Sequence, residues 1–312
     1  MLEFLRQYKL TYMVYNFFHK SLLQHNELVY KKLGLKKKYY SSISSKDFEQ
    51  FPGGQEEHYS LNEDDVKKTA LFQTLPAKDQ ESLLAFAENG YAVLSGYVAP
   101  EVCDEINQQI ESGVATGKYH FINEGKIMFA FRSIAQLEAI GKNPLLNELL
   151  NVLIRGKAIL FQSINFVRGS EQFTHSDSIH MTTFPLGGLL GVWIALEDID
   201  DDNGPLHYYP GSHKLPYYLN KDYDNEGSAW KLGNKSYPAY EAMIERKIEE
   251  QGLQKKVFTA KKGDVLLWHA NLFHGGNPHT NPQKSRKSVV FHYFKEGAVC
   301  YHEISQRPAL MK

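Results

Sequence analysis

Short apolar runs recur through the second half of the chain, and Gly, Pro, Asn or Asp residues separate them. They lie at 158–166, 187–196, 206–209, 263–268 and 288–294. The first run is rich in β-branched and aromatic residues, which is typical of a strand. Short strands divided by turn residues predict an antiparallel sandwich or barrel. The polar, Tyr-rich insert 216–254 interrupts the series and ends in a helical stretch at 241–251.

Helical periodicity precedes this β-rich part. We expect helices over 76–89, 100–112 and 143–154, with a short strand at 91–97 between the first two. The helix at 100–112 begins on proline, which suits the first helical turn. The sequence therefore predicts a mainly β core flanked by helices on its N-terminal side.

The first forty residues form a basic, aromatic-rich segment with loosely helical spacing. We call residues 1–40 the arm. It carries two acids, Glu3 and Glu27, against eight basic residues: Arg6, Lys9, Lys20, Lys31, Lys32, Lys36, Lys37 and Lys38. We expect its apolar stripe to pack on the protein while its lysines stay solvated. Peripheral contact with an anionic membrane is the alternative. Residues 41–66, which include Pro52-Gly53-Gly54, indicate a linker.

Composition and charge limit the classes of function that the chain can have. The 312 residues carry 35 Lys and Arg against 36 Asp and Glu, so no excess charge favours nucleic acid. The longest apolar run, 187–196, is far shorter than the roughly 18 residues of a membrane span. Two isolated cysteines are compatible with a reducing compartment, and we expect a cytoplasmic protein. We divide the chain into arm and linker (1–66) and one domain (67–312), with its core at about 85–295.

His175-Ser176-Asp177 is the first candidate for chemistry. Side chains two apart in an extended segment point to the same face, so His175 and Asp177 can reach one ion. His274 follows another predicted strand, and Gly275-Gly276 leave room for a ligand beside it. Two histidines and one carboxylate suit non-haem Fe(II) oxygenases. His269 is the rival for the second histidine.

Arg286 and Ser288 stand twelve and fourteen residues after His274. A planar guanidinium can hold a carboxylate through two hydrogen bonds, and Ser288, on the same face of an extended chain, can add a hydroxyl. The pair indicates an anionic co-substrate beside the metal.

These motifs, in this order, resemble the phytanoyl-CoA dioxygenase family of iron- and 2-oxoglutarate-dependent oxygenases. The resemblance covers about 85–295 and rests on Phe161-Gln162 through Asn165, His175-Ser-Asp177, Trp193 to Asp198, Asn203-Gly-Pro-Leu206, Pro210 to Lys214, Gly263-Asp264, His274-Gly275 and Arg286. It implies a double-stranded β-helix, the jelly-roll or cupin-like fold. It implies Fe(II) on His175, Asp177 and His274, and 2-oxoglutarate on Arg286, with O2 as the second co-substrate. Gln162 and Asn165 match positions that help to hold 2-oxoglutarate in some members.

The resemblance further implies hydroxylation of a small molecule with release of succinate and CO2. Asp177 favours hydroxylation, because halogenating relatives replace this carboxylate. The candidate substrates are an acyl thioester, an amino-acid derivative or a secondary metabolite. His180, Thr182 and Trp193 are candidate substrate contacts, and His180 could instead support a ligand through a hydrogen bond. The loops 113–132 and 216–254 are expected to set specificity.

Two other functions remain open at this point. His175, Asp177 and His180 could form a zinc hydrolase cluster, although Phe173 stands where a further histidine would be needed. A non-catalytic jelly-roll binding protein is the second. The oligomeric state does not follow from the sequence.

Overall fold

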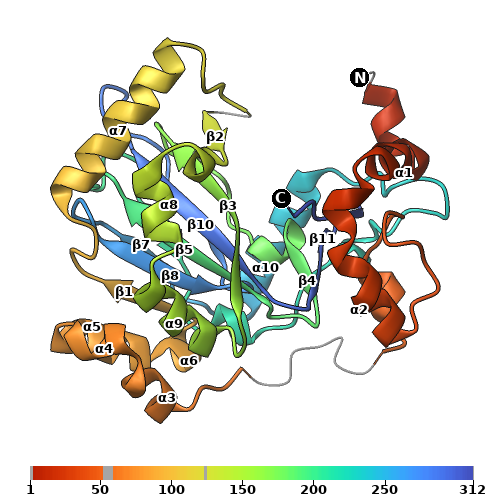
Figure 1. Ribbon diagram of the computed structural model, residues 1–312, viewed down its shortest axis with the longest axis horizontal. Coiled ribbons are helices and arrows are strands. Elements are labelled where there is room, and N and C mark those ends of the chain that lie inside the picture. The colour runs from red at the N-terminus through yellow and green to blue at the C-terminus, as the bar shows by residue number, and fades with distance from the viewer. Residues whose placement is uncertain (1–2, 52–58, 123–124, 312) are drawn as a thin grey trace.

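A six-stranded antiparallel sheet forms the centre of the computed structural model, which describes residues 3–51, 59–122 and 125–311 (Figure 1). Its strands, in spatial order, are β1 (Tyr91–Leu94), β8 (Val265–His269), β5 (Leu189–Ala195), β10 (Ser288–Lys295), β3 (Ala158–Phe166) and β2 (Lys126–Met128). Every neighbouring pair is antiparallel. The predicted strand at 158–166 is confirmed in full.

A second, three-stranded antiparallel sheet packs on one face of the first. It consists of β7 (Lys256–Phe258), β6 (Leu206–Tyr208) and β9 (His274–Gly276). Trp193, Leu266 and Val290 of the large sheet form one buried cluster with Leu206 and Phe258 of the small sheet. Two packed antiparallel sheets agree with the predicted double-stranded β-helix, and the fold class is confirmed.

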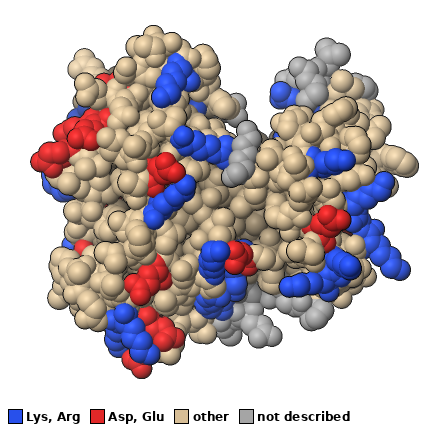
Figure 2. Space-filling view, viewed as in Figure 1, with Lys and Arg blue, Asp and Glu red and all other residues tan. Residues whose placement is uncertain are grey.

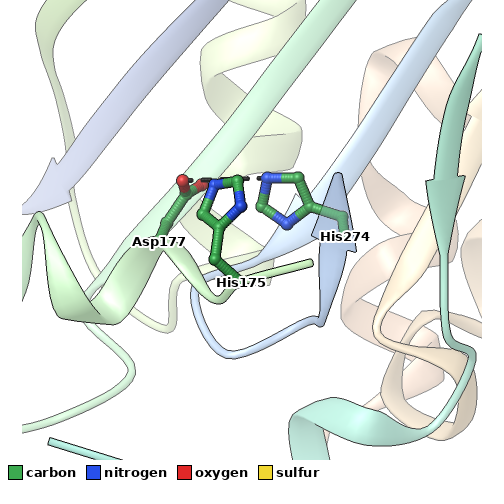
Figure 3. Close-up of side chains that lie close together, drawn as sticks. All are labelled: His175, Asp177 and His274. Carbon is green, nitrogen blue, oxygen red and sulfur yellow. Dashed lines mark ion pairs between the residues drawn. The ribbon is translucent and has the colours of Figure 1, made fainter. Parts of the chain in front are cut away.

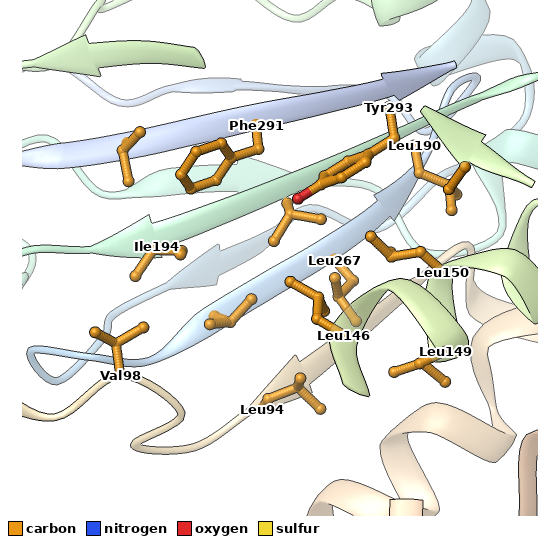
Figure 4. Close-up of a cluster of buried hydrophobic side chains, with 14 of the residues drawn as sticks. Leu94, Val98, Leu146, Leu149, Leu150, Leu190, Ile194, Leu267, Phe291 and Tyr293 are labelled. Atoms are coloured by element: carbon orange, nitrogen blue, oxygen red, sulfur yellow. The ribbon is translucent and has the colours of Figure 1, made fainter. Parts of the chain in front are cut away.

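Helices cover the opposite face of the large sheet. They are α7 (Pro100–Ala115), α8 (Ala135–Gly141) and α9 (Pro144–Leu153). Leu146, Leu149 and Leu150 of α9 belong to the same buried cluster as Leu94 and Tyr293 of the sheet (Figure 4). The Asn143 side chain caps α9 by accepting hydrogen bonds from the Leu145 and Leu146 amides. This layer leaves the other face of the sheet for the candidate site.

Several element boundaries differ from the expectation. The helix expected at 76–89 is two helices, α5 (Ala77–Leu84) and α6 (Phe86–Asn89), and the helix expected at 100–112 continues to Ala115. The strand expected at 91–97 ends at Leu94. Its ladder stops there because the next two amides, of Ser95 and Gly96, donate to the carboxylates of Asp79 and Asp264. The insert helix, α10 (Tyr237–Glu250), begins four residues earlier than expected.

The arm contains α1 (Lys9–Phe18) and α2 (His25–Leu33), and it lies beside a third sheet of β12 (Arg307–Pro308), β11 (Val299–His302) and β4 (Thr182–Phe184) (Figure 1). Tyr30, Ile43 and Phe48 bury against Phe184 and Tyr301. The expected packing therefore holds for α2, whereas the large apolar side chains of α1 are largely exposed.

Part of the predicted linker 41–66 is helical. α3 (Glu63–Lys68) begins inside it and α4 (Ala70–Thr74) follows, while Pro52-Gly53-Gly54 lie outside the described residues. No helix in the described part of the chain is long and apolar enough to cross a membrane.

Candidate active site

Backbone pairing brings His175 and His274 together. They form an isolated antiparallel bridge in which each amide donates to the other residue's carbonyl at 2.9 Å. Asp177 follows two residues after His175. One potential ligand atom from each of these three buried side chains lies within 4.8 Å of the others (Figure 3). Among the described residues this is the only His, Cys, Asp and Glu group with that geometry. His269 lies outside it and packs 5.4 Å from the His213 ring centroid.

Main-chain carbonyls orient both imidazoles. Nδ1 of His175 donates to the Phe173 carbonyl at 2.8 Å, and Nδ1 of His274 donates to the Leu272 carbonyl at 2.9 Å. Because a carbonyl can only accept, Nδ1 carries a proton in each ring, and in the neutral form of such a ring Nε2 keeps its lone pair. Burial, followed by the nearby His274, lowers the pKa of His175 to about 3. Neutral imidazoles of this tautomer are metal ligands.

Asp177 is held as a carboxylate by its neighbours. The indole Nε1 of Trp268 donates to Oδ2 at 2.7 Å, and Nε2 of His292 lies 3.6 Å from the same oxygen. Burial acts to raise the pKa of Asp177, but His274 and His292 outweigh it and the pKa is lowered. Gly191 faces Trp268 in the strand register, and a Cβ at that position would collide with the indole.

Arg286 is a buried cation that forms no salt bridge with any described residue. Its side chain is 1% exposed, and Nε and Nη1 have no partner among the described residues. Burial lowers its pKa to about 10, which Glu197 partly opposes, so the guanidinium stays charged at neutral pH. Its Cζ lies 5.5 Å from the Phe166 ring centroid and 5.9 Å from that of Trp193. A buried, unpaired charge is costly, and the site therefore fits an anionic ligand.

Two further polar groups stand near this cation. The Ser288 hydroxyl and the Trp193 indole nitrogen are buried, and in the described part of the chain neither finds a hydrogen-bond partner. Ser288 lies two residues after Arg286 on β10, and Trp193 lines the same pocket as Arg286. Together with the guanidinium they supply the donors that a carboxylate group needs.

A cavity of about 1100 Å³ connects these groups. It is lined by the three candidate ligands and Arg286, and by aromatic, sulfur and histidine side chains that include Phe161, Met181, His180, Tyr237, Phe294 and His302. Gln162 also lines it, with its amide 3.2 Å from Nδ1 of His292. The His180 imidazole meets the Tyr237 hydroxyl at 3.0 Å. His180 does not belong to the group of potential ligand atoms, so the structure does not assemble the alternative zinc cluster of His175, Asp177 and His180.

Three expectations need correction. Asn165 lies between Ile164 and Phe166, which both line the pocket, so it points to the other face of the strand. Its partner across the ladder is Val289, which belongs to the helix-covered core. Asn165 therefore faces away from the site. The hydroxyl of Thr182 is buried and donates to the Ser178 carbonyl at 2.6 Å. Gly275 lines the pocket as expected, but the backbone of Gln172 and Glu171 also occupies the space beside Gly275 and Gly276.

The two expected specificity loops do line the pocket, through Lys126 and Phe129 in one case and Tyr237 and Glu241 in the other. Sequence reasoning missed the support of Asp177 by Trp268 and His292. It also missed the C-terminal wall, where His302 and Arg307 line the pocket. His292 shares the strand face of Arg286 and Ser288, a period-two signal that could have found it.

Comparisons with known proteins agree with this geometry. The profile of the Phytanoyl-CoA dioxygenase (PhyH) family matches residues 86–288. Phytanoyl-CoA dioxygenase domain-containing protein 1 of Danio rerio is 24% identical over 267 residues, 66% of this chain and 87% of that protein. The Mus musculus protein of the same name is 30% identical over 146 residues, 44% of this chain and 48% of that protein.

Solved structures show the same fold. The non-heme alpha-ketoglutarate-dependent carbocyclase SnoK from nogalamycin biosynthesis matches with a TM-score of 0.60 and 15% identity, covering 77% of this chain and 94% of that one. EctD from S. alaskensis with 2-oxoglutarate and 5-hydroxyectoine matches with a TM-score of 0.54 and 18% identity, covering 77% and 83%. The family match, and not this likeness in fold, counts against the non-catalytic alternative. With the family profile matching about two thirds of its length, the chain belongs to the phytanoyl-CoA dioxygenase family, and it is a 2-oxoglutarate-dependent iron dioxygenase.

Proposed function

We propose that the chain hydroxylates a small molecule while 2-oxoglutarate is oxidatively decarboxylated to succinate and CO2. One atom of O2 would enter the substrate and the other succinate. The buried Arg286 supports this proposal most, because two of its guanidinium nitrogens lack hydrogen-bond partners among the described residues and it lines the same pocket as His175, Asp177 and His274, which favours an anionic co-substrate.

The proposal gives each residue a defined task. His175, Asp177 and His274 would hold Fe(II), which supplies the O2 chemistry when it is bound. Arg286 would pair with the distal carboxylate of 2-oxoglutarate, with Ser288 and Trp193 as further donors. Gln162 would act indirectly, since its amide lies against His292, which in turn lies beside Asp177. As one of these donors, Trp193 would lie on the co-substrate side of the pocket, whereas we expected it to contact the substrate.

The pocket walls support a substrate with an apolar body and a hydrogen-bonding group. Phe161, Met181 and Phe294 supply apolar surface, while His180 and Tyr237 supply polar atoms. Burial lowers the pKa of His180 well below its ordinary value, with His302 contributing, so its imidazole is neutral and can donate or accept. Acyl thioesters, amino-acid derivatives and secondary metabolites all meet this description.

An anaerobic titration tests the proposal. Fe(II) followed by 2-oxoglutarate should give the weak visible charge-transfer absorption of the chelate, and candidate substrates should stimulate succinate formation. His274→Ala should abolish iron binding, whereas His269→Ala, the matched control on β8, should retain it. Zinc-dependent ester hydrolysis without any 2-oxoglutarate turnover would contradict the proposal.

We also propose a cytoplasmic location. Both cysteines, Cys103 and Cys300, are free and buried in the structure, which is compatible with a reducing compartment.

A further inference from the structure

Helix α1 turns its apolar side outward. Leu10, Val14, Phe17 and Phe18 follow the i, i+4, i+7, i+8 spacing of one helix face, and all four are exposed, Phe18 by 77% and Leu10 by 61%. The buried residue of α1 is polar: Asn16 is 0% exposed and donates to the Tyr40 carbonyl at 3.1 Å. A helix that buries an amide and exposes two phenylalanines is unusual for a water-facing surface.

Trp230 extends this face. Its carbonyl accepts a hydrogen bond from the Lys9 amide at 3.0 Å, which fixes residue 230 at the start of α1, and its side chain is 75% exposed. We call Leu10, Val14, Phe17 and Phe18 of the arm, together with Trp230 of the insert, the apolar face. Tryptophan and phenylalanine are the side chains that settle at the boundary between lipid headgroups and acyl chains.

The arm that carries the apolar face is basic, and Nζ of Lys20 lies 5.2 Å from the Phe17 ring centroid. Figure 2 shows Lys and Arg gathered on the lobe that carries the arm, with few acidic side chains among them. Those of the arm that are exposed are Arg6, Lys20, Lys31, Lys32, Lys36, Lys37 and Lys38. Glu27 is the single acid among described side chains of the arm, and Asp47 pairs with Lys37 at 2.7 Å. The surplus is positive and complements an anionic surface.

We propose that the arm docks the enzyme on an anionic lipid bilayer, with the apolar face at the acyl-chain boundary and the lysines on headgroup phosphates and carboxylates. A second copy of the chain fits less well, because a symmetric contact would bring two lysine-rich arms together.

The arm also lies next to the pocket. Arg307 lines the pocket, and its guanidinium carbon lies 5.2 Å and 5.6 Å from the ring centroids of Tyr12 and Tyr15 on α1. The Met311 amide donates to the Leu22 carbonyl at 3.1 Å. Docking through α1 would therefore hold a wall of the pocket close to the membrane.

Vesicle co-sedimentation of the full chain tests this proposal. Phosphatidylcholine vesicles containing about 30% phosphatidylserine should bind the protein at low salt, pure phosphatidylcholine should bind it less, and 0.5 M NaCl should weaken binding. Phe18→Ser should reduce partitioning at least about tenfold. Phe121→Ser, which changes an equally apolar residue that is 49% exposed before β2, should leave it unchanged.

The same co-sedimentation assay tests the contribution of the arm's lysines. Lys20→Ala, beside Phe17, should lower partitioning about fivefold, while Lys78→Ala on α5 should not. A wild-type protein that stays in the supernatant with phosphatidylserine vesicles at low salt overturns the proposal. A wild-type dimer in sedimentation equilibrium that becomes monomeric in Phe18→Ser also overturns it, and identifies a second copy as the occupant. Neither result depends on the proposed hydroxylation.

Discussion

Trp268→Phe isolates one hydrogen bond to the proposed iron ligand Asp177. The indole donates to Oδ2 at 2.7 Å inside the protein, where Trp268 is 3% exposed. Phenylalanine keeps an aromatic ring but leaves that oxygen without its donor. A lost hydrogen bond to a buried charged group costs about 1.5–3 kcal/mol, and loss of a hydrogen bond to a metal ligand weakens metal binding about 10- to 100-fold. We therefore expect Fe(II) to bind about 10- to 100-fold more weakly.

The matched control is Trp193→Phe. Trp193 is also buried and lines the same pocket, but its indole nitrogen has no partner among the described residues. Anaerobic Fe(II) titration against a chromogenic chelator should show near wild-type affinity for this variant. Urea unfolding of the metal-free proteins measures the packing lost in each case. Equal iron affinities in the two variants would refute the role assigned to the Trp268 hydrogen bond.

Three further changes test neighbouring parts of the site. Gly191→Ala should displace the Trp268 indole and weaken Fe(II) binding in the same titration, whereas Gly297→Ala, where a Cβ meets open space but φ is +82°, should strain its turn without changing iron affinity. Arg286→Lys should raise the KM for 2-oxoglutarate by about tenfold or more with iron affinity unchanged, because an ammonium cannot replace a two-point guanidinium contact; an unchanged KM would contradict the co-substrate assignment. His207 bonds Thr174 and Asn277, and burial, aided by Lys255, lowers its pKa to about 4. Its folded-state pKa is below the unfolded value of about 6.5, so the free energy of unfolding should rise with pH between about 4 and 6.5 and level off above. His207→Gln should flatten that rise by at most about 3 kcal/mol in urea titrations, and an identical slope would exclude this histidine as its source.

The sequence indicated the metal group because its members have recognisable neighbours. His175 and Asp177 are two apart in an extended segment, and Arg286 and Ser288 repeat that spacing where the chain enters β10. Strand periodicity places such pairs on one face without any knowledge of the fold. The same rule separates Gln162 from Asn165: three residues apart on one strand, they point to opposite faces, and only Gln162 lines the pocket.

Contacts between distant segments were harder to predict. Trp268 reaches Asp177 only because Gly191, on a neighbouring strand, lacks a side chain that would block the indole. The C-terminal wall depends on β11 pairing with β4, which no local pattern indicates. The arm illustrates a third limit. Helical spacing predicted α1. Which side of the helix is buried, however, depends on a hydrogen bond that Asn16 donates to the distant Tyr40 carbonyl.

The carbonyls that hold both imidazoles belong to the main chain, at Phe173 and Leu272. No side-chain replacement at either position removes such an acceptor. The path of the main chain therefore sets the orientation of both rings. Side chains between the ligands can change with little effect on metal binding. Variation can then accumulate in the pocket walls, so that a lineage built on this site could acquire new substrates while its iron chemistry stays intact.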